Sequence, residues 1–182
     1  ITLSAANGTH SPIVLDGMIS GTGSGSGITV GGTGTLLLSG NGSNTYTGNT
    51  TVNNANAVLL LNKTGADAIA GQLILTAGTA RLGQSNQVAD TSNLGFTTAG
   101  TGIFDLNGRS ETINTIVGAA GTTGTITSSV VGNSTLTLSG NAAGDTQVSI
   151  IDGNGTVSLV KNGLSSLILR ASSTYSGGTT LN

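Results

Sequence analysis

The residues that could carry catalytic chemistry are few and scattered. Seven acidic side chains, five basic side chains and one histidine are spread over 182 residues. The tightest group is Asp105, Arg109 and Glu111, beside the turn residues Asn107 and Gly108. Glycosidic cleavage needs two carboxylates facing across a groove, and lyase chemistry needs a base beside a cation. The trio is therefore the candidate for a polysaccharide-cleaving site, but we favour a surface salt bridge with Asp105 and Glu111 facing outward around Arg109.

The other titratable groups lack the spacing of a metal or nucleophilic site. His10 is the single histidine and cysteine is absent, so we expect His10 to be a solvated turn residue. The segment Asp152–Gly155 is the nearest fragment to a calcium-binding repeat, and the matching Asp16-Gly17 favours a turn at both places. We expect solubilising or edge-protecting charges at Lys63, Arg81, Lys161 and Arg170. We therefore predict no cofactor, no metal and no enzyme activity.

Composition excludes several classes of protein. Gly, Thr, Ser and Asn make up more than half of the chain and are poor helix formers. A hydrophobic content of 36% argues against disorder. Five scattered basic residues predict no nucleic-acid partner, and the longest apolar run, Ala57 to Leu61, is too short for a membrane span. No leader is visible at Ile1, so we expect the chain to be a segment of a longer array.

The elements that must position these side chains are short strands. Apolar clusters of three to five residues are bounded by Gly, Asn or Ser, as at Ile28–Val30, Leu36–Leu38 and Leu167–Leu169. Thr135–Ser139 alternates strictly, which is typical of a strand with one buried face. An antiparallel sandwich and a parallel β-helix both fit, and the aliphatic core candidates without Trp favour the β-helix. We predict an all-β protein of about eight coils, each roughly 20–25 residues long.

The chain contains an internal repeat. Residues 33–53 match residues 163–182, and Tyr46 and Tyr175 occupy equivalent positions. Weaker matches extend the copies, so residues 1–53 and 136–182 are two copies of one repeat element and residues 54–135 are the intervening coils. We predict one continuous β-helix segment over residues 1–182. The motif residues that we expect to be structural are Leu36, Leu38, Gly40, Asn44, Thr45, Tyr46, Gly48, Thr50, Thr51, Leu167, Leu169, Thr174, Tyr175, Gly177, Thr179 and Thr180.

The stretch from Gly34 to Gly40, followed by Asn44 to Val52, resembles the passenger-associated transport repeat, the autotransporter-associated β-strand repeat of bacterial surface proteins. The second copy departs from the pattern at Leu164-Ser165 and Arg170-Ala171. The resemblance implies a right-handed parallel β-helix in an exported passenger, at or beyond the bacterial cell surface. It supplies no catalytic residues.

Three functions are compatible with this pattern. The first is a structural stalk, fibre or surface-layer element whose partners are neighbouring repeats or copies of itself placed end to end. The second is a carbohydrate-binding adhesin module that uses outer rows of Thr, Asn and Tyr to hold surface glycans. The third is a polysaccharide-cleaving β-helix enzyme. We favour the stalk, with Tyr46 and Tyr175 packed at corners and turn asparagines stacked into ladders.

Overall fold

The fold consists of strands and turns alone in the part of the chain that the structure, a computed structural model, describes: residues 2–3, 12–23, 25–118 and 121–182. No helix is present in these residues. The strands are β1 (Thr2–Leu3), β2 (Ile13–Asp16), β3 (Ile28–Val30), β4 (Thr35–Ser39), β5 (Thr50–Leu61), β6 (Leu73–Leu82), β7 (Leu94–Asp105), β8 (Glu111–Ile113), β9 (Ile116–Val117), β10 (Gly124–Thr127), β11 (Asn133–Leu138), β12 (Gly144–Thr146), β13 (Ser149–Ile150), β14 (Thr156–Lys161), β15 (Leu167–Leu169) and β16 (Thr179–Leu181).

These strands wind into a parallel β-helix with three sides. The first side holds β1, β3, the starts of β5, β6 and β7, then β9, β12 and β15. The second side holds β2, β4, the ends of β5, β6 and β7, then β10 and β13. The third side holds corner segments in the early turns and β8, β11, β14 and β16 later. Every described pair is parallel, so the predicted all-β parallel β-helix is confirmed and the sandwich is excluded.

The core is built of rows of mainly aliphatic side chains that repeat once per turn. On the second side, the inward position is occupied in successive turns by Leu36, Leu59, Ala80, Phe104, Ile126 and Ile150, all buried. Each interval between neighbours in this stack falls within the coil length that the sequence predicts. Leu136 and Leu138 of β11 are likewise buried, and the threonines beside them are half-buried, as the alternation predicts.

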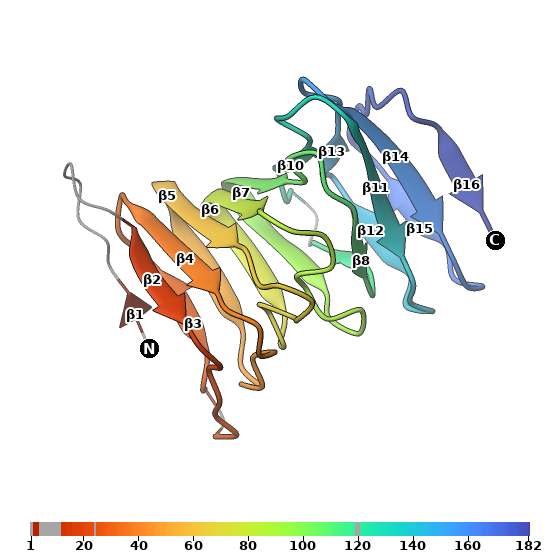
Figure 1. The fold of residues 1–182 in the computed structure, drawn as a ribbon. Coiled ribbons are helices and arrows are strands. Elements are labelled where there is room, and N and C mark those ends of the chain that lie inside the picture. The colour runs from red at the N-terminus through yellow and green to blue at the C-terminus, as the bar shows by residue number, and fades with distance from the viewer. Residues whose placement is uncertain (1, 4–11, 24, 119–120) are drawn as a thin grey trace.

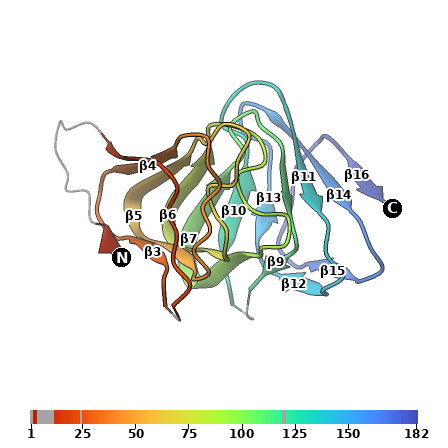
Figure 2. The same cartoon turned by 60° about the horizontal axis from the view of Figure 1, so that its bottom comes forward.

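The coil count is lower than predicted, about seven turns rather than eight. Some turns are longer than those of the stack on the second side, as the pairing of Thr2 with Thr29 shows. The termini lie at opposite ends of the stack (Figure 1), and the strands of successive turns lie over one another around a common axis (Figure 2). The molecule is therefore a short rod with a different turn exposed at each end.

One side of the rod is interrupted. On the first side, β9 lies against β12 without a strand pairing between them, and the interval from Ile116 to Gly144 is longer than an ordinary coil. The second side remains continuous through β7, β10 and β13, and the third side is continuous from β8 to β16. The interruption coincides with three buried hydroxyls, of Thr97, Thr115 and Thr122, that have no hydrogen-bond partner among the described residues.

Candidate functional site

The predicted trio of Asp105, Arg109 and Glu111 is not assembled. Asp105 is buried and forms an ion pair with Arg81, one turn earlier, with Arg81 Nε 2.8 Å from Asp105 Oδ2. Its carboxylate also accepts hydrogen bonds from the backbone N–H and the hydroxyl of Ser129, one turn later, at 2.9 and 2.7 Å. Arg109 is exposed. The expectation of an outward-facing salt bridge around Arg109 is therefore wrong, because the neighbours of Asp105 are the residues stacked on it.

Glu111 belongs to a buried polar ladder inside the rod. Lys63, Gln87 and Glu111 occupy equivalent positions in three successive turns, and each is at most 1% exposed. The Glu111 carboxylate accepts the Gln87 backbone N–H at 2.8 Å, and the Gln87 side-chain amide bonds both the N–H and the C=O of Lys63, at 2.7 and 2.9 Å. Burial raises the pKa of Glu111 to about 8, although backbone N–H donors oppose the shift.

Two lysines predicted at the surface are buried instead. Lys63 completes the ladder by donating from Nζ to the carbonyls of Gly17 and Ser39, at 2.8 and 2.9 Å. Burial lowers the pKa of Lys63, and the charge of Asp16 opposes that shift. Lys161 is 4% exposed and donates to the carbonyls of Gly140 and Asn162. Both ammonium groups therefore satisfy backbone carbonyls inside the rod, and the prediction of solubilising charges is wrong for both.

The two copies of the tyrosine motif form the same contacts. The Tyr46 hydroxyl lies 2.5 Å from Thr50 Oγ1, and the Tyr175 hydroxyl lies 2.7 Å from Thr179 Oγ1. Thr45 and Thr174 each donate a backbone N–H to an isoleucine carbonyl of the preceding turn, at 2.9 Å in both copies. That isoleucine in turn donates its own N–H to Asn44 Oδ1 in the first copy and to Ser173 Oγ in the second. The motif is thus a corner that locks one turn onto the turn before it.

Both motif copies require glycine at the same position, because a side chain there would clash with the preceding turn. A Cβ on Gly48 would lie 2.5 Å from the carbonyl oxygen of Ser26, and a Cβ on Gly177 would lie 2.5 Å from the carbonyl oxygen of Val157. The glycine N–H bonds that same carbonyl, at 3.0 and 2.9 Å. Any larger residue would separate the two turns, so the match between the copies at this position reflects close stacking.

The other motif residues differ in exposure between the copies. In the first copy the buried members are Leu36, Leu38, Asn44, Tyr46 and Thr50, the half-buried ones are Gly40, Gly48 and Thr51, and Thr45 is exposed. In the second copy Leu167, Leu169 and Tyr175 are half-buried, and Thr174, Gly177, Thr179 and Thr180 are exposed. The corner packing predicted for Tyr46 agrees with its 2% exposure, and burial raises its pKa to about 12.

The copies lie on different sides of the rod. Leu36–Leu38 belongs to β4 on the second side, whereas Leu167–Leu169 forms β15 on the first side. Five turns lead from Leu36 to Ile150 on the second side, and Leu167 lies two sides further on. The motif therefore recurs after five and two-thirds turns, so the two copies are rotated by one side.

The second copy forms an open end. A hollow of about 390 Å³ is lined by Leu159, Leu167, Leu169, Tyr175 and Leu181, among others. Leu181 is 77% exposed. In the first copy the same surface is covered by the next turn, whose Ala68 carbonyl lies 3.4 Å from the Tyr46 hydroxyl. The hollow is therefore core surface that lacks a covering turn in the structure.

The remaining candidate site residues are His10 and Asp152. His10 lies outside the described residues. Asp152 lies at a turn and accepts backbone N–H bonds from Val157 and Ser176, at 2.7 and 3.0 Å. A bond from the Ser176 side chain is the main cause that lowers the pKa of Asp152, followed by the Val157 N–H. Among the described residues, no group of three His, Cys, Asp or Glu side chains could hold a metal, and no helix is long and apolar enough to cross a membrane.

Within the described part of the chain, asparagine side chains bond between turns in two places. Asn114 donates to Asn93 Oδ1 at 2.8 Å, and Asn182 donates to Asn162 Oδ1 at 2.9 Å. The predicted asparagine ladders are thus present as pairs. Comparison with known proteins adds no relative, since no family model, no curated protein and no solved structure matches this chain.

Proposed function

We propose that this chain is part of a stiff β-helical stalk or fibre of a bacterial cell surface, extended by further turns of the same kind. The observation that carries the proposal is the repeated corner motif. It occurs twice with the same Tyr–Thr bond, and in the first copy it is buried under a following turn. A turn of similar shape would bury Tyr175, Leu169 and Leu181 as the turn after Tyr46 buries its equivalents.

The interior suits a stiff rod. Two groups of buried polar side chains are bonded between turns, the ladder from Lys63 to Glu111 and the network around Asp105. An added turn would pair with the last one and leave an edge of the same kind, so further turns lengthen the rod without changing the character of its ends. The bacterial surface location and export rest on the motif resemblance alone.

The proposal is tested at the open end. In analytical ultracentrifugation we expect the chain to associate with increasing concentration into particles that electron microscopy shows as rods lengthened along their axis. Leu181→Lys should abolish this association, because a charge would be buried between stacked turns. Val131→Lys is the matched control, since Val131 is 81% exposed but lies on a loop at the flank of the rod. Equal association of both variants would refute the proposal.

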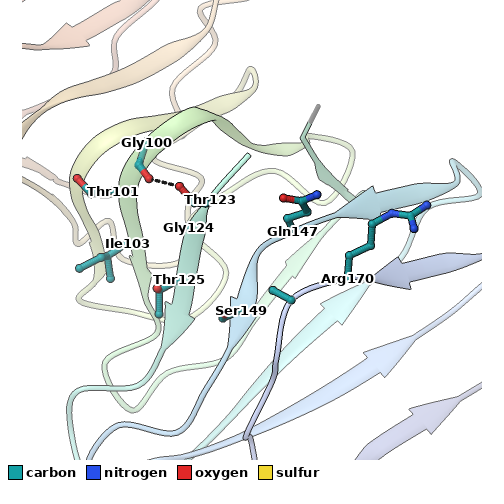
Figure 3. Close-up of a pocket in the computed structure, with 11 residues that line it drawn as sticks. Gly100, Thr101, Ile103, Thr123, Gly124, Thr125, Gln147, Ser149 and Arg170 are labelled. Atoms are coloured by element: carbon teal, nitrogen blue, oxygen red, sulfur yellow. Dashed lines mark hydrogen bonds between the residues drawn. The ribbon is translucent and has the colours of Figure 1, made fainter. Parts of the chain in front are cut away.

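A carbohydrate-binding module is the second candidate function. The observation that favours it is a groove on the outer face of the second side, whose lining includes Thr101, Thr125 and Ser149 (Figure 3). That groove is separate from the open end, so the two functions can be tested independently.

A further inference from the structure

The segment that follows β4 contains an Asn–Gly pair that the packing does not require. Asn41 is exposed, and neither its side-chain amide nor the backbone N–H of Gly42 has a hydrogen-bond partner among the described residues. A Cβ on Gly42 would meet the Met18 side chain at 3.5 Å, an ordinary van der Waals contact, and the φ angle of Gly42 is not in the left-handed region. An alanine would therefore fit at position 42.

The internal repeat shows that the corner forms without this pair. Tyr46 lies ten positions after Leu36, whereas Tyr175 lies eight positions after the equivalent Leu167. The segment before the tyrosine is thus two residues shorter in the second copy, yet both tyrosines form the same bond to a threonine hydroxyl. The Asn–Gly pair is therefore an addition to the first copy and not part of what the corner needs.

Three other Asn–Gly pairs lie in the part of the chain that the structure describes, and two of them are held by bonds between turns. The Gly108 N–H donates to the Ser128 hydroxyl at 2.9 Å, and the Gly155 N–H donates to the Ser128 carbonyl at 3.0 Å. The side-chain amides of Asn107 and Asn154 each donate to a backbone carbonyl one turn earlier, at 2.7 and 2.9 Å. Neither pair can change conformation without breaking these bonds.

The third pair, Asn162 and Gly163, is held by its side chain. Asn162 Oδ1 accepts the amide of Asn182 at 2.9 Å. Gly163 has a φ of 79°, and a Cβ on it would lie 2.3 Å from Asn141 Oδ1, so the turn itself requires glycine. Among the four pairs that the structure describes, the one after β4 is thus the one with both reacting groups unbonded.

An unbonded Asn–Gly pair can react with itself. The Gly42 nitrogen, after its proton passes to hydroxide, attacks Cγ of Asn41. The N–Cγ bond forms, the Cγ–Nδ2 bond breaks, and ammonia leaves with a proton taken from water. Water then opens the cyclic imide at one of its two carbonyls, which yields aspartate, or isoaspartate with the main chain running through Cγ. No atom is oxidised or reduced, and glycine favours the attack because it samples backbone conformations that a Cβ would exclude.

We propose that Asn41 is a self-modification site, which the chain converts to aspartate and isoaspartate through an imide with Gly42. The product carries one more negative charge, close to an existing carboxylate, because Asp16 Oδ1 would lie 3.1 Å from a Cβ on the adjacent Gly40. The modification adds a charge to a chain whose net charge is already −2. It does not depend on assembly into a fibre.

The isoaspartate product also changes the backbone of this segment. The segment is anchored on both sides, since the Gly40 carbonyl accepts the Thr64 N–H at 2.9 Å and the Asn44 N–H donates to the Asp67 carbonyl at 2.9 Å. Isoaspartate lengthens the main chain between these two anchors. The added length therefore stays in the exposed loop, and the turns on either side keep their register.

The test is peptide mapping by tandem mass spectrometry of the folded full chain, after incubation at neutral and at mildly alkaline pH. Conversion at Asn41 should rise with pH, because hydroxide removes the Gly42 proton. We expect Asn41 to convert about tenfold faster than Asn154, which is also exposed, because reaction at Asn154 requires its turn to open first. In the urea-unfolded chain the two asparagines should convert at similar rates.

Gly42→Ala is the matched variant, because the packing accommodates its Cβ. We expect it to slow conversion at Asn41 about tenfold and to leave the melting temperature nearly unchanged. Equal conversion of Asn41 and Asn154 in the folded chain, or an unchanged rate in Gly42→Ala, would overturn the proposal. Failure of end-to-end association would leave this result unaffected.

Discussion

Replacing Glu111 by Gln should change how the stability of the rod depends on pH. Glu111 is 1% exposed, and its carboxylate accepts backbone N–H bonds from Gln87 at 2.8 Å, Thr112 at 3.1 Å and Val88 at 3.4 Å. Burial outweighs these bonds, and with a smaller contribution from the charge of Asp90 it raises the pKa from 4.5 to about 8. The folded protein therefore keeps this carboxyl protonated over a range in which the unfolded chain loses the proton.

The sign and size of the effect follow from proton linkage. Between pH 4.5 and about 8 the folded state binds one more proton at Glu111 than the unfolded state does, so the free energy of unfolding falls as pH rises. The fall is about 1.4 kcal/mol per pH unit, or about 5 kcal/mol over the interval. With glutamine at position 111 the free energy of unfolding does not depend on pH in this way. The amide, however, turns an N–H donor toward backbone N–H groups, which lowers the free energy of unfolding by about 1–3 kcal/mol.

Urea unfolding followed by far-ultraviolet circular dichroism at pH 5 to 9 measures the difference. We expect the wild type to be more stable than Glu111→Gln at pH 5 and less stable at pH 9, so the two curves cross. Asp67, whose pKa is raised by burial and by the charge of Asp90, is present in both proteins and cancels in the difference. A difference in unfolding free energy that is independent of pH would show that Glu111 is ionised in the folded state throughout.

Five further substitutions test the interior and its surface controls. Asp105→Asn should lower the free energy of unfolding by about 1–3 kcal/mol, because it weakens the bonds that a buried carboxylate forms with Arg81 and Ser129. The exposed Arg109→Ala should change it by less than about 0.5 kcal/mol in the same urea titration. Tyr46→Phe should lower the free energy of unfolding by about 1–2 kcal/mol, because the buried Thr50 hydroxyl loses its partner. Tyr175→Phe removes an exposed bond and should lower the melting temperature far less. Equal effects of the two substitutions would contradict the difference in burial. Lys63→Met should lower the free energy of unfolding by about 1–3 kcal/mol, because two buried carbonyls lose their donor. Hydrogen exchange should rise locally around Gly17 and Ser39, whose carbonyls Lys63 bonds.

The apolar clusters are sufficient to predict the architecture, because a stacked core requires aliphatic residues at one spacing and the chain supplies them. Clusters such as Leu36–Leu38 and Leu167–Leu169 are strands at their predicted places. The corner role of Tyr46 follows from its repeat. Long strands such as Thr50–Leu61 are not predicted, since the polar residues at their middle suggest a turn.

The charged interior cannot be predicted from neighbours in the sequence. Local spacing groups Asp105 with Arg109, but the partner of Asp105 is Arg81, one coil earlier. The same one-coil interval separates Lys63 from Gln87 and Gln87 from Glu111. In a solenoid the residue one coil distant is the physical neighbour, so a search for polar residues at the coil period reveals both networks.

The rotation between the two tyrosine corners has a consequence for any longer array. If the motif recurs every five and two-thirds turns, each repeat faces a direction one-third of a circle away from the last, and three repeats restore the first orientation. Exposed threonines at these corners would then follow a helical path around the rod axis. An antibody raised against one corner would decorate such a filament as a spiral, and no flank of it would be free of the epitope.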